Sequence, residues 1–562
     1  MAAPGWHLPL AVDAHTAGLV HRLSRACGLS AAQILDEALQ EWARSRGLEE
    51  EAGDADWSAQ LEWLPKIFGL LGEEAGQLGN ARLVCHSWAA QALGSLQSLN
   101  PAWDTPSEQS VARVEGLLRH CTQLKELTVH MRGALWEQLS EPEAVALLST
   151  ACSLPELQSL NIFAEQLGPA HLGALRPALP RLNSLRLATR AIKVSQAELT
   201  DAFGAMTAVA RLDLDTSYKE RDGSIKMPDY NAMYEHALAA LPPSLTSLSL
   251  AGIRFGQGGL AKLVALPSLT SLELGMCRFS GSMGLAGAST LRSLTLGLDE
   301  SREESDLEDI LGLSSLRQLH IDIFILPPHF TDRLANALPG LTSLSLLSYT
   351  VNDDALRPLG RLTGLTHLEV SSYWDEMAEW TGVIGDGLVH LSSLTQLQSL
   401  TMKSHNHPDF PVHLLEHMRN LPALKSLHIQ SMRIDDGMAA RMPPQLEHLA
   451  LLFCSLDHNT LAALATRCPR LISIDLGDEV SLQGLAQLGR LSCLQRIFLH
   501  PWSVLPVPLL PGVLGVLLRA APDEVIEPRL WYHDNRMPVS PRVAATVVEQ
   551  LSTILSNQAI PR

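Results

Sequence analysis

The sequence is poor in the features that mark secreted and membrane-spanning proteins. Its 562 residues contain 8 cysteines, with no paired spacing typical of a disulfide framework, so we expect reduced and mostly buried thiols. No apolar run approaches the roughly 18 residues of a transmembrane helix. The first seven residues lack the basic head and the apolar core of a secretory signal. These absences predict a cytoplasmic or nuclear protein.

Basic residues are also scarce, because 42 lysines and arginines stand against 60 aspartates and glutamates, a formal net charge of −18. A charge of this sign disfavours a general nucleic-acid surface and favours a basic or neutral partner. Signatures of catalysis are missing as well: the sequence has no phosphate-binding loop, no GxSxG elbow and no cluster at zinc spacing. We therefore expect a non-enzymatic chain that uses no metal or cofactor.

Leucine at a fixed spacing is abundant. In Leu269-Thr-Ser-Leu272-Glu-Leu274, the alternation after the second leucine predicts a short strand. Fifteen copies of this pattern occur at a mean step of about 26 residues, which is typical of leucine-rich repeats. Their first residues are Leu124, Leu157, Leu182, Val209, Leu245, Leu269, Leu291, Leu316, Leu341, Leu365, Leu397, Leu424, Leu446, Leu471 and Leu494.

One repeat cannot bury its three aliphatic side chains alone, so neighbouring repeats must stack around a shared core. The predicted fold class is an α/β leucine-rich repeat solenoid, a horseshoe with a parallel inner sheet, preceded by small helical segments. The stretches 259–266 and 460–467 have helical spacing and are expected on the convex side. Cys277 and Cys454 stand three residues after the last strand aliphatic, where this repeat class uses Asn or Cys to bond the turn backbone.

Four segments follow from these patterns: 1–50, 51–103, a solenoid at 104–502, and a C-terminal cap with a tail helix at 503–562. The first has a strand at 7–12, a helix, a Gly28-Leu29-Ser30 turn and a second helix, and it resembles a ribbon-helix-helix unit. That family reads DNA with basic strand residues, whereas 7–12 contains no lysine or arginine. We expect a helical hairpin that packs or forms a homodimer, and contact with DNA is the weakest hypothesis.

The stretch 57–88 contains two amphipathic segments. Leu61, Leu64, Ile67 and Phe68 recur at helical spacing, and the second segment closes on the letters ARLVCHSW at 81–88. Together these segments resemble an F-box. The proline that usually follows the first leucine of that motif comes later here, at Pro65. The next residues, 92–101, resemble the segment that joins an F-box to its repeats in green-algal and plant proteins.

In F-box proteins the apolar residues of these helices bind a Skp-type adaptor, which tethers the module to a cullin-based ubiquitin ligase. The resemblance implies that the chain is the substrate-recognition subunit of an SCF-type ligase. Its implied adaptor contacts are Leu61, Leu64, Pro65, Ile67, Phe68, Leu83, Val84 and Trp88. The alternative is a protein-interaction scaffold in which the same helices only cap the open end of the solenoid.

The exposed positions of the predicted strands are expected to bind the target. Serine precedes the second leucine in nine repeats, which leaves the inner face polar and shallow. The next exposed position varies, and the insertion after residue 370 adds aromatic side chains, which either anchor an interface or fold back onto the neighbouring repeat. The candidate target-binding residues are Asp213, Glu273, His320, Glu369, Tyr373, Trp374, His428 and Asp475.

Overall fold

The chain forms two compact units, each a stack of strand-and-helix repeats. Unit 1 contains the described residues up to 226 together with 236–245, and unit 2 contains Glu235 and the described residues from 246 onward. The computed structural model describes residues 96–100, 108–131, 139–219, 225–226, 235–298, 305–327, 329–348, 351–372, 386–404, 418, 421–430, 434–454, 456–476, 487–488, 490–494 and 496–499.

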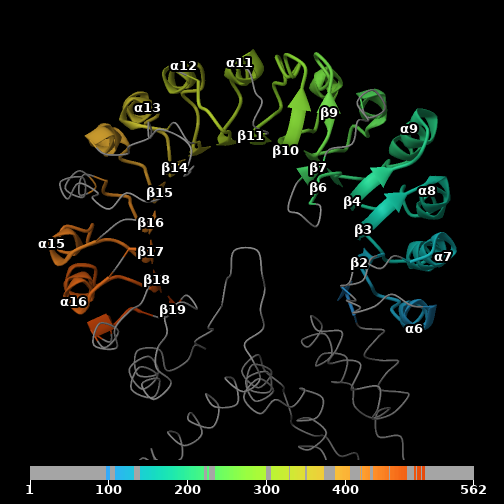
Figure 1. Ribbon diagram of the computed structural model, residues 1–562, viewed down its shortest axis with the longest axis horizontal. Coiled ribbons are helices and arrows are strands. Elements are labelled where there is room, and N and C mark those ends of the chain that lie inside the picture. Colours follow the sequence, from blue (N-terminus) through green and yellow to red (C-terminus); the bar gives the residue numbers. More distant parts are fainter. Residues whose placement is uncertain are drawn as a thin grey trace, which may run out of the picture. The chain divides into compact units, whose positions relative to one another are not determined.

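Unit 1 is a parallel sheet with helices along one side (Figure 1, blue to teal). Strands β1 to β5 pair in chain order, each parallel to the next. The insertion after β5 forms an antiparallel pair of its own, β6 with β7. The elements are β1 (Ser98–Leu99), α6 (Glu108–Leu118), β2 (Glu126–His130), α7 (Glu141–Cys152), β3 (Ser159–Leu167), α8 (Pro169–Leu175), β4 (Ser184–Ile192), α9 (Gln196–Gly204), β5 (Arg211–Asp215), β6 (Tyr218–Lys219), β7 (Ile225–Lys226) and η2 (Leu238–Ala240).

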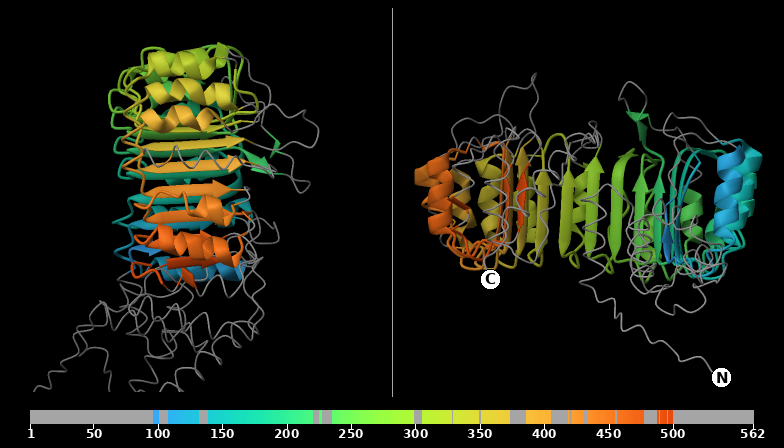
Figure 2. Two further views of the ribbon diagram at one scale, coloured as in Figure 1. Left: turned by 90° about the vertical axis from the view of Figure 1, so that its left-hand side faces the viewer. Right: turned by 90° about the horizontal axis from the view of Figure 1, so that it is seen from below.

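Unit 2 repeats the same plan, and Figure 2 shows its strands pointing in one direction. Strand β8 pairs with β10, and β10 to β19 then pair in chain order. The elements are β8 (Ser247–Ala251), β9 (Arg254–Phe255), η3 (Ala261–Ala265), β10 (Ser271–Phe279), β11 (Ser293–Leu298), α11 (Ser305–Leu311), β12 (Gln318–Asp322), α12 (Phe330–Ala337), β13 (Ser343–Leu347), α13 (Asp353–Leu356), η4 (Arg357–Arg361), β14 (His367–Ser372), η5 (Asp386–Ser393), β15 (Ser399–Ser404), β16 (Ser426–Gln430), α15 (Asp436–Ala439), β17 (His448–Leu452), α16 (His458–Arg467), β18 (Ser473–Leu476) and β19 (Arg496–Leu499).

The core of each unit lies between its sheet and its helices. The aliphatic triads that define the first fourteen repeats are all buried, none of their side chains being more than 3% exposed. The strand register pairs Leu272 with Leu248 on one side and with Leu294 on the other, so equivalent leucines form continuous rows. Each such leucine contributes about 1.5–3 kcal/mol of transfer free energy. The predicted α/β leucine-rich repeat solenoid is therefore confirmed in each unit.

Two cysteines bond a strand carbonyl of the preceding repeat, whereas the repeat pattern predicts a bond to turn backbone. The Cys277 thiol donates to the Leu250 carbonyl of the preceding repeat at 3.2 Å, and the Cys454 thiol donates to the Ile429 carbonyl at 3.5 Å. The residue before each cysteine adopts the left-handed region, with φ of 50° at Met276 and 55° at Phe453. At Met276 the reversal is a bulge inside β10, whereas Phe453 follows the end of β17. In both places the thiol donates to a backbone carbonyl and satisfies it.

The convex side differs from the prediction in one of the two stretches. Residues 458–467 form the helix α16, as expected, whereas the predicted helix at 259–266 is the short 3₁₀ segment η3. The strand β9 precedes this stretch and pairs with β10, and Gly258 lies between β9 and η3 with φ of 68°. A 3₁₀ segment rises about 2.0 Å per residue against 1.5 Å for an α-helix, so it spans a short connection with fewer residues.

Helix starts are fixed by side-chain caps. At α9 the Ser195 amide donates to the Glu198 carboxylate at 2.7 Å, and the Glu198 amide donates back to the Ser195 hydroxyl at 3.2 Å. At α16 the Thr460 amide donates to the Asp457 carboxylate at 2.7 Å. These hydrogen bonds hold the pKa of Glu198 and of Asp457 below their usual values. Caps of this kind satisfy the free amides of a first helical turn and set where each convex helix begins.

Candidate functional site: the exposed faces of the two sheets

Every second residue of a strand points away from the core, and these residues form the exposed face of each sheet. On β14 the side chains of Leu368 and Val370 are buried, whereas Glu369 between them is half-buried. The parallel register places Glu369 beside Ser345 of β13 and Thr401 of β15. Equivalent repeat positions therefore form rows across the strands. We call the outward-pointing residues of β1–β5 the unit 1 face, and those of β8 and β10–β18 the unit 2 face.

The first exposed row is rich in serine, as the sequence predicts. Ser247 of β8 pairs with Ser271 of β10, which in turn pairs with Ser293 of β11. All nine serines at this position are half-buried. Their short side chains keep the row polar and leave the strand backbone close to the surface.

Six of the eight predicted target-binding residues lie within the described ranges, and all six occupy the second exposed row. Asp213 lies on the unit 1 face in β5. The unit 2 face carries the other five, which are Glu273, His320, Glu369, His428 and Asp475. Tyr373 and Trp374 fall outside the described residues, as do the eight implied adaptor contacts between 61 and 88 and the segments 1–50 and 503–562.

Three of these predicted residues belong to one group, the Glu369 cluster, formed by His320, Ser345, Glu369, Lys403 and His428. The Lys403 Nζ lies 2.6 Å from Glu369 Oε1, and the Ser345 hydroxyl donates to Glu369 Oε2 at 2.8 Å. Both charged side chains are only about a quarter exposed, at 28% for Lys403 and 27% for Glu369. Burial alone raises the pKa of Glu369, but the Lys403 contact, the Ser345 hydrogen bond and the His320 charge outweigh it and lower the pKa. Glu369 is therefore ionised at neutral pH.

His428 supplies a neutral imidazole at the edge of this cluster. Burial and, to a lesser extent, the Lys403 charge together lower the pKa of His428 to about 4, although the Glu369 charge acts in the opposite direction. Its Nε2 atom is buried and has no hydrogen-bond partner among the described residues. A proton on this ring would lie close to the Lys403 ammonium, so the ring stays uncharged at neutral pH.

The unit 1 face carries a ladder of planar groups that crosses its strands. The His130 ring stacks on Phe163, with 4.8 Å between ring centroids and 12° between the ring planes. The Arg186 guanidinium lies over the other end of the ladder, 5.3 Å from the Phe163 centroid, and its Nε is 3.0 Å from Asp213 Oδ2. Burial lowers the pKa of His130, whose Nε2 lies 3.0 Å from the Asn100 side-chain oxygen. Asp213 is thus one end of a ladder that the sequence did not reveal.

Sequence reasoning missed Lys403, Phe163 and Arg186. Strand alternation alone could have placed all three on the exposed faces, because each lies an even number of residues from another outward-pointing residue. Their contacts needed more information. Lys403 reaches Glu369 on the neighbouring strand although the register sets it opposite Ser371, so the pair is diagonal.

The chemistry offered by these faces is hydrogen bonding and charge. In the part of the chain that the structure describes, no group of three or more His, Cys, Asp or Glu residues is placed to hold a metal ion. Five of the described cysteines are buried, and burial raises the pKa of Cys121 to about 11 and those of Cys152 and Cys468 to about 12. Such thiols stay protonated at neutral pH and are poor nucleophiles.

No helix in the described ranges is long and apolar enough to cross a membrane.

No protein-family model matches the chain, and no curated protein sequence matches it. Among solved structures, it is similar to an internalin (inlF) of Listeria monocytogenes at 21% identity, with 54% of this chain and 82% of that chain covered and a TM-score of 0.35. It is also similar to an internalin C2 (inlC2) of the same organism at 21% identity, covering 42% and 83% of the two chains with a TM-score of 0.26. At these values the likeness assigns no function, and the chain's own repeat geometry is what makes it a leucine-rich repeat protein.

Proposed function

We propose that the chain is a non-catalytic scaffold that binds a protein partner through the exposed faces of its two sheets. One observation carries this proposal: side chains of different charge and shape occupy the second exposed row, above an aliphatic core that hardly changes. Folding needs only the core, so nothing in the repeat itself requires a half-buried Lys403–Glu369 pair or a planar ladder at Arg186. A partner that contacts these groups would account for them.

The dimensions of the faces suit a protein better than a small molecule. A standard protein interface buries about 800 Å² and 20–30 residues on each side. In the described part of unit 2 alone, the ten strands of its face present two or three outward-pointing residues each. Small-molecule sites are instead concave and mostly apolar, whereas these rows are built from serine, threonine, histidine and charged residues.

A pair of charge-swapped variants tests this proposal. Glu369→Lys with Lys403→Glu keeps an ion pair on the unit 2 face but reverses its direction. Asp332→Arg with Arg361→Asp does the same on the convex side, where Arg361 Nη2 lies 2.6 Å from Asp332 Oδ1. The Glu369→Lys/Lys403→Glu variant (the face swap) should no longer capture the proteins that the parent chain captures from cell extract, whereas the Asp332→Arg/Arg361→Asp variant (the convex swap) should still capture them. Crosslinks between the parent chain and a captured protein should map to the sheet faces. Equal capture by all three chains contradicts the proposal.

We further propose that the scaffold serves as the substrate-recognition subunit of an SCF-type ubiquitin ligase. The support is sequence alone: the letters ARLVCHSW at 81–88 and the apolar spacing at 61–68 resemble an F-box, and both lie outside the described residues. In this role residues 57–88 would bind a Skp-type adaptor, the sheet faces would hold the target, and the chain would act in the cytoplasm or nucleus.

Pull-down with a purified Skp-type adaptor tests the ligase role. The parent chain should retain the adaptor, and a Leu83→Asp/Trp88→Ala variant should lose it. Capture by both chains, or by neither, would leave a scaffold whose helical segment serves only as a cap. The swap experiment on the sheet faces is independent of this result.

A further inference from the structure

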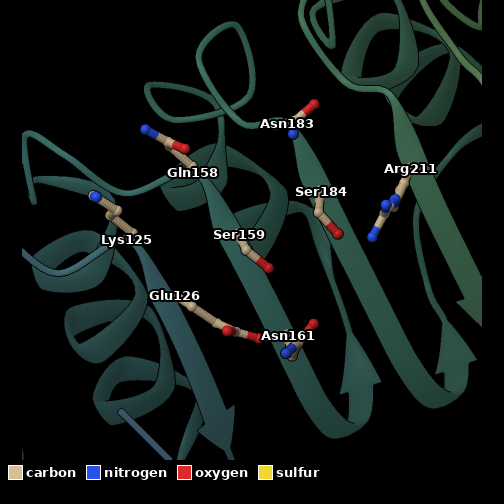
Figure 3. A pocket seen from close by; sticks show the side chains of 8 residues that line it. All are labelled: Lys125, Glu126, Gln158, Ser159, Asn161, Asn183, Ser184 and Arg211. Atoms are coloured by element: carbon tan, nitrogen blue, oxygen red, sulfur yellow. The ribbon is translucent and has the colours of Figure 1, made fainter. Parts of the chain in front are cut away.

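The unit 1 face contains an open pocket of about 380 Å³ at the N-terminal ends of β2, β3, β4 and β5. Figure 3 shows the eight side chains that line it, and every one of them is polar or charged. The pocket lies beside the planar ladder and shares none of its residues. Binding pockets for small apolar molecules are lined mainly by hydrophobic and aromatic side chains, so this pocket suits a polar ligand.

The repeat register explains why these side chains are available. The backbone N–H of Gln158 donates to the backbone carbonyl of Lys125, and the backbone N–H of Asn183 donates to the backbone carbonyl of Gln158, both at 2.8 Å. The Arg211 amide continues the series by donating to the Asn183 carbonyl at 3.1 Å. The backbone groups at the strand ends are thereby satisfied, and the side chains of the same residues are left to point into the pocket. Ser159 and Ser184, on the next position along, are short and form its floor.

The pocket holds two cations that lack a counter-ion. Lys125 lies at one side and Arg211 at the other (Figure 3), and neither makes an ion pair within the described part of the chain. Arg186 on the same face is neutralised by Asp213. Glu126 is the single carboxylate of the lining, and Figure 3 shows it extended toward Asn161. A net positive pocket on a chain of formal charge −18 favours an anionic ligand.

The separation of the two cations indicates the form of that ligand. Residues on β2 and β5 are three strand spacings apart, about 14 Å. An extended peptide of four residues spans about 13 Å, so a peptide lying across the strands can place one carboxylate at each cation. The side-chain amides of Gln158 and Asn183 lie between the two cations and can form hydrogen bonds with the main chain of such a peptide. The lining has no aromatic side chain on which a nucleic-acid base could stack.

We propose that this pocket binds an extended acidic peptide segment of a partner protein, with carboxylates four residues apart at Lys125 and Arg211. The Gln158 and Asn183 amides bond the main chain between the two carboxylates. Glu126 repels a third carboxylate next to Lys125, so the site selects spaced acids over a continuous acidic run. This inference names the partner chemistry of the unit 1 face and so rests on the proposed protein-binding function.

Fluorescence anisotropy of the full chain with a labelled peptide containing Asp-Thr-Ala-Thr-Asp provides the test. The peptide should bind, and its affinity should fall as salt is added. The isomer Asp-Asp-Thr-Ala-Thr and the uncharged Asn-Thr-Ala-Thr-Asn should bind at least about 5-fold less tightly. Lys125→Gln and Arg211→Gln should each lower the affinity for the Asp-Thr-Ala-Thr-Asp peptide by about 5-fold or more. Lys193→Gln removes an exposed cation of unit 1 outside the pocket and should leave binding unchanged.

Several outcomes would overturn the inference. Equal binding of the three peptides, or an unchanged affinity in both pocket variants, excludes the proposed site. Competition by millimolar inorganic phosphate as effective as that by unlabelled peptide identifies a plain anion site, and tighter binding of a single-stranded oligonucleotide identifies a nucleic-acid site. Each variant is also checked by circular dichroism for an unchanged unfolding midpoint. If the peptide fails while the face swap in unit 2 still abolishes capture, the pocket inference is wrong and the scaffold function stands.

Discussion

The two faces are built on the same aliphatic repeat, yet they handle charge in different ways. On the unit 1 face Arg186 and Asp213 pair at the end of a stack of planar groups, with side chains 44% and 30% exposed. On the unit 2 face the Lys403–Glu369 pair is more buried and adjoins a neutral histidine. Because both cores are equally well buried, the difference arises from the exposed positions alone. The core specifies the solenoid, and the exposed rows specify the surface chemistry.

The largest expected effect is a loss of stability that is confined to unit 2 and leaves unit 1 unchanged. A Cβ atom at Gly360 would clash with the His390 carbonyl of the next repeat and lie 3.0 Å from the Ser393 hydroxyl. Gly360→Ala should therefore destabilise unit 2 by about 3 kcal/mol, since neither backbone can move without disturbing the stack. Hydrogen exchange should speed up in β13–β16 and stay unchanged in β2–β5.

Gly364→Ala is the matched control, because a Cβ there meets the Leu341 carbonyl at an ordinary 3.6 Å. Its stability should stay within about 0.5 kcal/mol of the parent. Equal protection of unit 2 in the Gly360 and Gly364 variants would show that the convex layers can separate without cost.

The ion pairs of the two faces give the next comparison. Lys403→Met leaves the Glu369 carboxylate half-buried without its cation. It should lower the free energy of unfolding, measured by chemical denaturation, by about 2 kcal/mol. Adding Glu369→Gln to it should recover most of that loss, because the remaining amide carries no charge. A double variant as unstable as Lys403→Met alone would mean that the loss comes from packing of the lysine stem.

A pH titration should expose His428. The folded chain holds the pKa of His428 at about 4, below the ordinary histidine value of 6.5. The unfolded chain therefore takes up the proton first, so this contribution to stability is complete above pH 6.5 and is lost as the pH falls toward 4. With allowance for partial solvent exposure, unit 2 should lose about 1 kcal/mol by pH 5 relative to a His428→Gln variant. Parallel pH profiles for the two chains would disprove the shifted pKa.

The smallest effect is expected on the unit 1 face. Arg186→Gln removes a largely exposed ion pair and a cation–aromatic contact. In the parent chain these two contacts together should stabilise the sheet by about 0.5–1 kcal/mol, and the variant should lose that amount. The loss should shrink at 1 M salt, where the ion pair is screened. A loss as large as that of Lys403→Met would contradict the contrast between the two faces.

The sequence predicted the repeats well because burial and spacing are local properties. Every aliphatic triad from Leu124 to Leu476 is in the core, and Cys277 and Cys454 each bond a strand carbonyl of the preceding repeat. The strand β1 was not predicted, because Leu96 and Leu99 lack the third aliphatic of the pattern. The η3 segment was predicted as a helix, because apolar spacing does not distinguish a short 3₁₀ segment from an α-helix.

The candidate site was only partly predictable. Six exposed residues were placed correctly, but their neighbours depend on how strands align and how far side chains reach. Lys403 meets Glu369 diagonally, and Arg186 reaches Phe163 on the adjacent strand. The division of the repeats into two units falls in the longest step between repeat starts, from Val209 to Leu245, but a long step alone does not separate an insertion from a boundary. Contacts of this kind require coordinates.

The in-register pairing of unit 2 also bears on how such a surface could change in evolution. Gln318 of β12 aligns with Ser343 of β13, and Ser343 aligns with His367 of β14. Excision of residues 341–364 in one piece would bring β14 against β12 with the leucines still in frame, and His320 would then sit directly against Glu369. Gain or loss of one whole coil could thus rewrite recognition in a single genetic event, with the interior left intact.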